Sequence, residues 1–85
     1  MNLTEKKIGS ILIVVEKTSP HKAKLNSTLS EYADCIISRQ GLNLKERNYN
    51  LISLIVEGDI NRFNSFAGKI GRLKKVKIKM LIAKQ

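Results

Sequence analysis

The residues with the clearest chemistry in this chain are lysines near its C-terminal end. Lys75, Lys77 and Lys79 alternate with apolar residues, and this spacing places all three ammonium groups in one row on a β-strand. Such a row could contact the phosphates of a polyanion. A row of lysines also protects an exposed strand edge from aggregation, which is a common device. No aromatic residue interleaves with these lysines, so base stacking is not expected and the protective role is favoured.

Two further segments could hold a small anion. The loop from Glu16 leads into a helix start at Ser19 and Pro20, and the N–H groups of a helix N-terminus suit a carboxylate or phosphate. An ordinary capped helix is the favoured interpretation of these residues. Arg39 stands two residues before Gly41, where a guanidinium and an accessible backbone could grip an anion bidentately. A solvated edge charge beside a turn explains this pair equally well, so both interpretations stay open.

Metal and catalytic chemistry find little support. The chain has one cysteine, Cys35, and one histidine, His21, whereas a metal site needs three or four ligands, so no metal or cofactor is expected. The single cysteine also excludes an internal disulfide. A small hydrolase of the acylphosphatase type would need an Arg and an Asn around a phosphate loop after the first strand, and EKTS at 16–19 is a poor substitute. We therefore predict that the chain is not an enzyme.

The composition is that of a small, basic, folded protein. Hydrophobic residues make up 42% of the 85 residues, which is typical of a globular chain with a thin core. Sixteen Lys and Arg against seven Asp and Glu give a formal charge of +9, and this field attracts polyanions and acidic ligands. No apolar run approaches the length that spans a bilayer, and the N-terminus lacks the apolar segment of a signal peptide. We expect a cytoplasmic protein without membrane contact.

Hydrophobic periodicity divides the chain into two βαβ halves. Two strands are apolar at both alternating positions, which is typical of central strands, and each is followed by an amphipathic helix and a more polar strand. The predicted elements are strands at 8–15, 35–40, 51–57 and 75–82, helices at 20–34 and 60–71, a loop at 41–50, and Asp59 as a helix cap. Right-handed crossovers place strands one and three in the centre and strands two and four at the edges. The prediction is a flexible lead-in at 1–7 and a single α+β domain at 8–85. Its fold is a ferredoxin-like βαββαβ sandwich, a four-stranded antiparallel sheet with two helices on one face.

Two helices on one face leave the other face of the sheet uncovered. Leu12, Val14 and Ile55 of the central strands would then be exposed, and a wide apolar face usually marks an interface. We therefore predict a homo-oligomer, a dimer or a tetramer, in which sheets pack or extend against one another. Gly68 and Gly71 add a small-residue patch to the second helix, which allows close packing against the sheet or a partner chain.

Several segments spread along the chain carry a family resemblance. They are IVVE ending at Glu16, KLN at 24–26, EYAD at 31–34, Arg39 with Gly41, LISLIVEG at 51–58 and AGKIGRL at 67–73. Together they resemble the putative iron-only hydrogenase system regulators, over nearly the whole chain from about Lys7. The chain departs from the pattern of that family at Ser30 and Asn43, where histidine and proline are frequent.

The resemblance implies an ACT-like ferredoxin fold, similar to the C-terminal domain of nickel-responsive repressors, and a regulatory role in an oligomer. Ligands of ACT-like domains usually sit where the first strand-to-helix loop meets a neighbouring subunit. This implies ligand-binding roles for Glu16, Asn26, Arg39 and Gly41. The leading hypothesis is a non-enzymatic regulatory domain that senses a small molecule or a partner protein. The alternative is a nucleic-acid-binding protein that acts through its basic surface, although no helix-turn-helix supports direct sequence readout.

Overall fold

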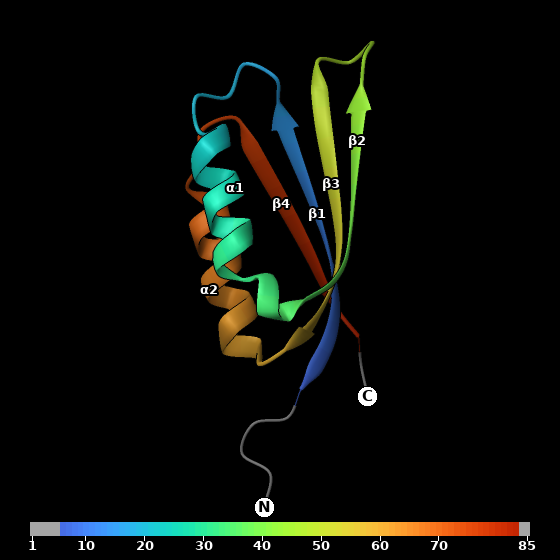
Figure 1. Ribbon diagram of the computed structural model, residues 1–85, viewed down its shortest axis with the longest axis vertical. Coiled ribbons are helices and arrows are strands. Elements are labelled where there is room, and N and C mark those ends of the chain that lie inside the picture. Colours follow the sequence, from blue (N-terminus) through green and yellow to red (C-terminus); the bar gives the residue numbers. More distant parts are fainter. Residues whose placement is uncertain (1–5, 84–85) are drawn as a thin grey trace, which may run out of the picture.

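The computed structural model describes residues 6–83, which form one four-stranded sheet with two α-helices on one side of it (Figure 1). The elements are β1 (Lys7–Glu16), α1 (Lys22–Glu31), the 3-10 turn η1 (Ala33–Cys35), β2 (Ile36–Leu44), β3 (Tyr49–Gly58), α2 (Ile60–Gly71) and β4 (Val76–Ile82). The strand order is β2-β3-β1-β4, and every pairing is antiparallel. The predicted ferredoxin-like βαββαβ sandwich is confirmed. β1 begins at Lys7, inside the predicted lead-in of 1–7, of which residues 1–5 lie outside the described part.

The two central strands bury every second residue under the helices. Ile11 of β1 stands opposite Leu54 of β3, and both side chains are at most 1% exposed. Their chain neighbours Leu12 and Ile55 are 43% and 39% exposed. Since successive side chains of a strand point to opposite faces, one face of the sheet forms the core. The other face, which we call the open face, is apolar at its centre and is not covered by either helix.

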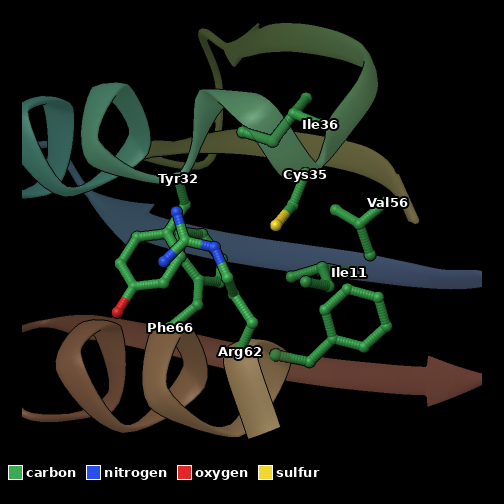
Figure 2. A pocket seen from close by; sticks show the side chains of 8 residues that line it. Ile11, Tyr32, Cys35, Ile36, Val56, Arg62 and Phe66 are labelled. Carbon is green, nitrogen blue, oxygen red and sulfur yellow. The ribbon is translucent and has the colours of Figure 1, made fainter. Parts of the chain in front are cut away.

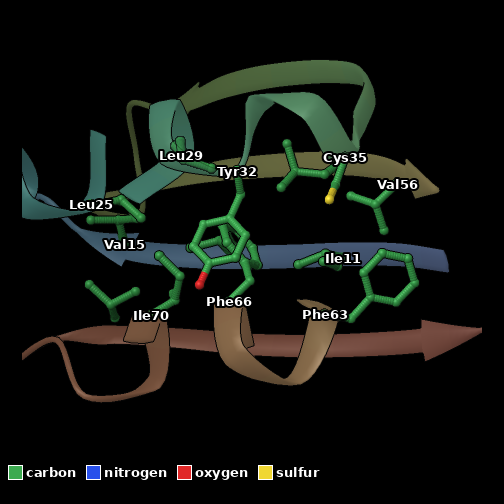
Figure 3. Packing of buried hydrophobic residues seen from close by; sticks show 13 residues of the cluster. Ile11, Val15, Leu25, Leu29, Tyr32, Cys35, Val56, Phe63, Phe66 and Ile70 are labelled. Atoms are coloured by element: carbon green, nitrogen blue, oxygen red, sulfur yellow. The ribbon is translucent and has the colours of Figure 1, made fainter. Parts of the chain in front are cut away.

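The core fills the space between the sheet and both helices (Figure 3). α2 contributes Phe63, Phe66 and Ile70, whose spacing of three and four residues places them on one stripe. α1 contributes Leu25 and Leu29 in the same way. Burial of each large apolar side chain stabilises the fold by roughly 1.5–3 kcal/mol. This packing holds α1 at a fixed position over the central strands.

The first helix begins later than predicted. α1 starts at Lys22 behind His21, whose side chain does not cap it, and Pro20 lies in the preceding turn. Ser19 is buried, and its hydroxyl donates a hydrogen bond of 2.7 Å to the carbonyl of Lys74. The predicted helix start was wrong because this long-range hydrogen bond ties the β1–α1 loop to the loop before β4. Ser19 Oγ also accepts a 3.2 Å hydrogen bond from the backbone N–H of His21, so Ser19 pairs a backbone N–H as expected, in the turn before the helix.

The β2–β3 hairpin is longer than predicted. Residues 41–44 and 49–50, expected in a loop, continue the two strands, and residues 45–48 form the turn. Asn48 adopts a left-handed φ of 58°, which asparagine tolerates better than most residues. The strand signal was weak because β2 is an edge strand whose side chains are mostly exposed and mix apolar with polar residues. Its backbone pairs with β3 whatever those side chains are.

The second helix starts as predicted and ends without a left-handed glycine. Asp59 Oδ1 accepts a 2.7 Å hydrogen bond from the backbone N–H of Asn61, which is an N-cap. Gly71 is the last helical residue, and Arg72 follows it in a right-handed conformation. The helix is thus stopped by the turn toward β4 and not by the conformational freedom of Gly71.

Candidate functional site

Asn26 lines a groove between α1 and the central strands. The groove has a volume of about 120 Å³, and its lining residues are Val15, Lys22, Leu25, Asn26, Asn50 and Ile52. The buried side chains of Val15 and Leu25 make its floor apolar. Lys22 supplies an ammonium group, and the two asparagines supply amides. This combination suits a small molecule that carries an anionic group and a hydrogen-bond donor.

Asn50 is the candidate residue that the sequence did not single out. Its side-chain Oδ1 is buried and has no hydrogen-bond partner among the described residues. A buried carbonyl left unpaired costs about 1–3 kcal/mol, so this position favours a bound N–H or O–H group. The sequence placed Asn50 in a loop, whereas it pairs with Val15 on the helix-covered face. A polar residue at an inward position of a strand is the signal that could have identified it.

Arg39 and Gly41 lie on β2, and their cross-strand partners on β3 face the helices. Both residues are exposed because β2 is an edge strand. A Cβ atom added at Gly41 would meet no atom within 4 Å, so open space lies above this residue. Gly41 shares a shallow hollow with Asn50 and Ile52, the two residues that also line the groove beside Asn26. The structure thus places Asn26, Arg39 and Gly41 on the helix side of the sheet.

Glu16 lies at the end of β1 and faces the other side of the sheet. The alternation that turns Val15 into the core turns Glu16 toward the open face. There it lines a hollow of about 90 Å³ with Val14, Tyr49, Lys75 and Lys77. Within one chain, therefore, the four residues implied by the resemblance do not form a single site: the sheet separates Glu16 from the groove of Asn26.

Two of the three predicted row lysines lie on a strand. Lys77 and Lys79 belong to β4 and stand opposite apolar residues of β1 on the open face. Lys75 precedes the strand with a φ of 62°, and its Nζ donates a 3.0 Å hydrogen bond to Thr18 Oγ1. The predicted strand start was one residue early because β4 begins at Val76, yet Lys75 still lines the hollow beside Glu16 together with Lys77. Contact of the three lysines with a polyanion stays a prediction. Lys77 and Lys79 border the apolar centre of the open face.

The two glycines of α2 do not bring the helix into close contact with the sheet. A Cβ atom at Gly68 would meet nothing within 4 Å, and one at Gly71 would lie 4.0 Å from Cγ2 of Ile78, an ordinary contact distance. Close packing by the sheet therefore does not explain them. Close approach by a partner chain stays a prediction, as do the interface roles of Leu12, Val14 and Ile55.

A cluster of charged residues joins the two helices around Tyr32. Arg62 Nη2 donates to Asp34 Oδ1 at 2.6 Å, and Lys69 Nζ donates to Glu31 Oε2 at 2.8 Å. These hydrogen bonds lower the pKa of Asp34 and of Glu31 and raise the pKa of Arg62 and of Lys69. Arg62 also lies over the Tyr32 ring, 4.5 Å from its centre (Figure 2). Each charge is paired with an opposite one, so the cluster has a structural role in joining the helices.

Cys35 borders a small cavity in the core that Arg62 overlies (Figure 2). Its volume of about 10 Å³ is close to the minimum for one water molecule, so it does not accommodate a ligand. In residues 6–83, no group of three or more His, Cys, Asp or Glu side chains could hold a metal ion. No helix in the same range is long and apolar enough to cross a membrane.

The chain is similar to known proteins in sequence and in structure. The TM1266-like family, described as "Iron-only hydrogenase system regulator, putative", matches residues 7–80. A solved structure of the uncharacterized protein TM1266 from Thermotoga maritima has a TM-score of 0.90 and 28% sequence identity, over 94% of this chain and 100% of that chain. No curated protein matches the chain.

Proposed function

Because the chain belongs to the TM1266-like family, we propose that residues 8–85 are a non-enzymatic regulatory domain that acts as a homo-oligomer and senses a small ligand or a partner protein. The observation that carries the proposal is the open face of the sheet. Leu12, Ile55 and Leu81 expose 39% to 73% of their surface on this face. Monomeric proteins rarely leave a contiguous apolar face of this kind in water, and such faces usually mark an interface.

The charges on the open face support association with a second copy. Strand alternation and pairing place two glutamates, Glu16 and Glu57, and two lysines, Lys77 and Lys79, on this face, and a third lysine, Lys75, lines the hollow beside Glu16. Three lysines against two glutamates leave a formal charge of +1 on this face, whereas the whole chain carries +9. Two copies can therefore bring these faces together with little concentration of positive charge. Elsewhere on the surface the excess of lysine and arginine opposes self-association.

A charge placed on the open face tests the assembly. Leu12→Glu buries an unpaired carboxylate in the proposed interface, so we expect sedimentation velocity to show a smaller species than the wild-type chain. Ile60→Glu is the matched control, because Ile60 is 38% exposed on the first turn of α2 and away from the open face. A wild-type chain that stays monomeric at high concentration would contradict the proposal.

The groove beside Asn26 is the proposed ligand site, and its polar groups indicate the class of ligand. A free amino acid carries a carboxylate for Lys22 and an N–H donor for the unpaired Oδ1 of Asn50. Arg39 and Gly41 flank this side of the sheet, and Glu16 would reach a ligand only in an assembly.

A panel of the standard amino acids, screened by thermal shift, tests the groove. We expect at least one compound to raise the unfolding midpoint of the wild-type chain, since a ligand that binds the folded state stabilises it. Asn26→Leu should abolish that shift, whereas Asn61→Leu on the exposed start of α2 should keep it. If no compound shifts the midpoint, amino acids are not the ligands and the sensing role passes to a partner protein.

The alternative function is nucleic-acid binding, and the net charge of +9 is the observation that favours it. Fluorescence anisotropy with a labelled random duplex at increasing salt separates the two functions. The regulatory proposal predicts no measurable affinity near physiological salt. Affinity at that salt, reduced in a Lys77→Gln/Lys79→Gln variant, would favour the alternative.

A further inference from the structure

Large and small side chains lie next to each other on part of the open face. Three cross-strand rows, each written from β2 through β3 and β1 to β4, make up its centre. They are Ser38–Ile55–Ser10–Leu81, Gln40–Ser53–Leu12–Lys79 and Leu42–Leu51–Val14–Lys77. In the first row a serine separates two large apolar residues, and in the second row Leu12 lies next to Ser53. The face is therefore a set of projections and gaps and not a uniform apolar surface.

These projections and gaps fit a second copy of the same face. A two-fold axis that runs along the strands between β1 and β3 reverses the strand order of the partner. It places β1 of the partner over β3, and β4 of the partner over β2. In the first two rows a large residue then meets a small one: Leu81 faces Ser38, Ile55 faces Ser10, and Leu12 faces Ser53. In the third row Leu51 faces Val14, an apolar contact. Packed sheets keep their strands within about 30° of each other, so the match holds best at the centre of the face.

The lysines of β4 favour the axis along the strands over a two-fold axis that runs across the strands. A two-fold axis across the strands, through the central row, would place β4 on β4 and bring Lys79 against Lys79 of the partner, with Lys77 of both copies close by. Like charges in an interface oppose association. The axis along the strands instead places Lys79 over Gln40 and Lys77 over Leu42, where a lysine stem covers apolar surface while its ammonium group reaches water.

From this fit of size and charge, we propose that the chain forms a face-to-face homodimer about an axis parallel to its strands, with β4 of each copy over β2 of the other. This inference rests on the proposed self-association and adds the orientation of the partner. The interface is isologous, so each copy contributes both the projections and the gaps.

Cross-linking of two variants, each with one added cysteine, tests the orientation. Chains with Lys79→Cys and chains with Gln40→Cys, one of them carrying a mass tag, are mixed and treated with a short bifunctional thiol reagent. We expect the mixed Lys79→Cys and Gln40→Cys product to exceed the Lys79→Cys product with itself by roughly tenfold. The wild-type chain controls for Cys35, whose thiol is buried. Predominant self-linking of Lys79→Cys, or a dimer in which neither pair is linked, would overturn the proposed orientation.

Exchanging the large and the small residue of one proposed contact tests the orientation independently, through the affinity of the dimer. Ser53→Leu fills the gap that faces Leu12 of the partner, and we expect the dimer dissociation constant to rise roughly tenfold. Leu12→Ser added to the same chain restores a large residue opposite a small one, and the dissociation constant should fall again. If the wild-type chain dimerises but the dissociation constant of the double variant does not fall again, the proposed orientation is overturned and the self-association stands. A wild-type chain that never dimerises overturns the proposed assembly as well.

Discussion

The guanidinium of Arg62 on α2 lies 4.5 Å from the centre of the Tyr32 ring, which follows the last turn of α1. The same group donates a hydrogen bond to Asp34. One side chain thus joins α2 to the segment that connects α1 to β2.

Removing this link should lower thermal stability. Arg62→Met keeps most of the aliphatic stem and removes the cation–π contact and the ion pair. We expect a lower unfolding midpoint by circular dichroism than for the wild-type chain. Arg72→Met, at the exposed end of α2, is the matched control and should leave the midpoint nearly unchanged. Equal midpoints for the two variants would show that the contact does not stabilise the fold.

The stability of the fold should fall in acid, because protonation of Asp34 and Glu31 weakens the ion pairs that join the two helices. Their pKa values are lowered in the folded chain, because Arg62 and Lys69 hydrogen-bond the charged carboxylates. Carboxylates of this kind contribute stability above their unfolded pKa values, and that contribution is lost as the pH falls through the lower folded values. Urea unfolding should therefore show the wild-type chain losing stability below about pH 5. An Asp34→Asn/Glu31→Gln variant should show a smaller loss, and parallel pH profiles would contradict the assignment.

Replacing glycine by alanine should raise the stability of the fold at one position and lower it at another. Gly68 lies inside α2 with open space beside it, so Gly68→Ala should stabilise the monomer by roughly 0.5–1 kcal/mol. In Gly9→Ala the new Cβ would lie 3.1 Å from the carbonyl oxygen of Leu81 and 3.0 Å from Cδ1 of Ile82. That crowding should destabilise the fold by about 1–3 kcal/mol. Urea unfolding measures both changes, and changes of the same sign would contradict the packing described for these positions.

The core should be sensitive to truncation of Phe66, which is 3% exposed and packs edge-on against Tyr32. Phe66→Ala should cost about 3–5 kcal/mol of unfolding free energy, because it removes apolar contact and leaves a cavity. Ile37→Ala, at a position that is 59% exposed, is the control and should change the stability by at most about 0.5 kcal/mol. A loss for Phe66→Ala no larger than for the control would show that the helices are not packed as described.

Asn50 should be replaceable without loss of stability. Its Oδ1 is buried without a partner among the described residues, and Asn50→Val removes this unpaired group at a strand position that β-branched residues suit. We expect an unfolding free energy equal to the wild-type value or up to about 1 kcal/mol higher. The exposed residue opposite it, Asn43, provides the control variant Asn43→Val. A marked loss for Asn50→Val alone would show that this amide has a structural partner and would weaken its assignment to a ligand.

Local patterns in the sequence determined most of the architecture. The two-sided apolar strands, the stripe of α2 and the Asp59 cap act over a few residues, so they predicted the order of elements and the central position of β1 and β3. The edges were harder to predict, because β2 owes its length to backbone pairing with β3 and not to its own side chains.

The tertiary structure alone decided which residues share a side of the sheet. Strand pairing turned Glu16 toward the open face and Asn50 toward the groove of Asn26, and the hydrogen bond from Ser19 to Lys74 moved the start of α1. These outcomes depend on groups far apart in the chain. The hydrophobic pattern of a segment shows that one of its sides is buried. Which other segment covers that side is determined only when the whole chain packs.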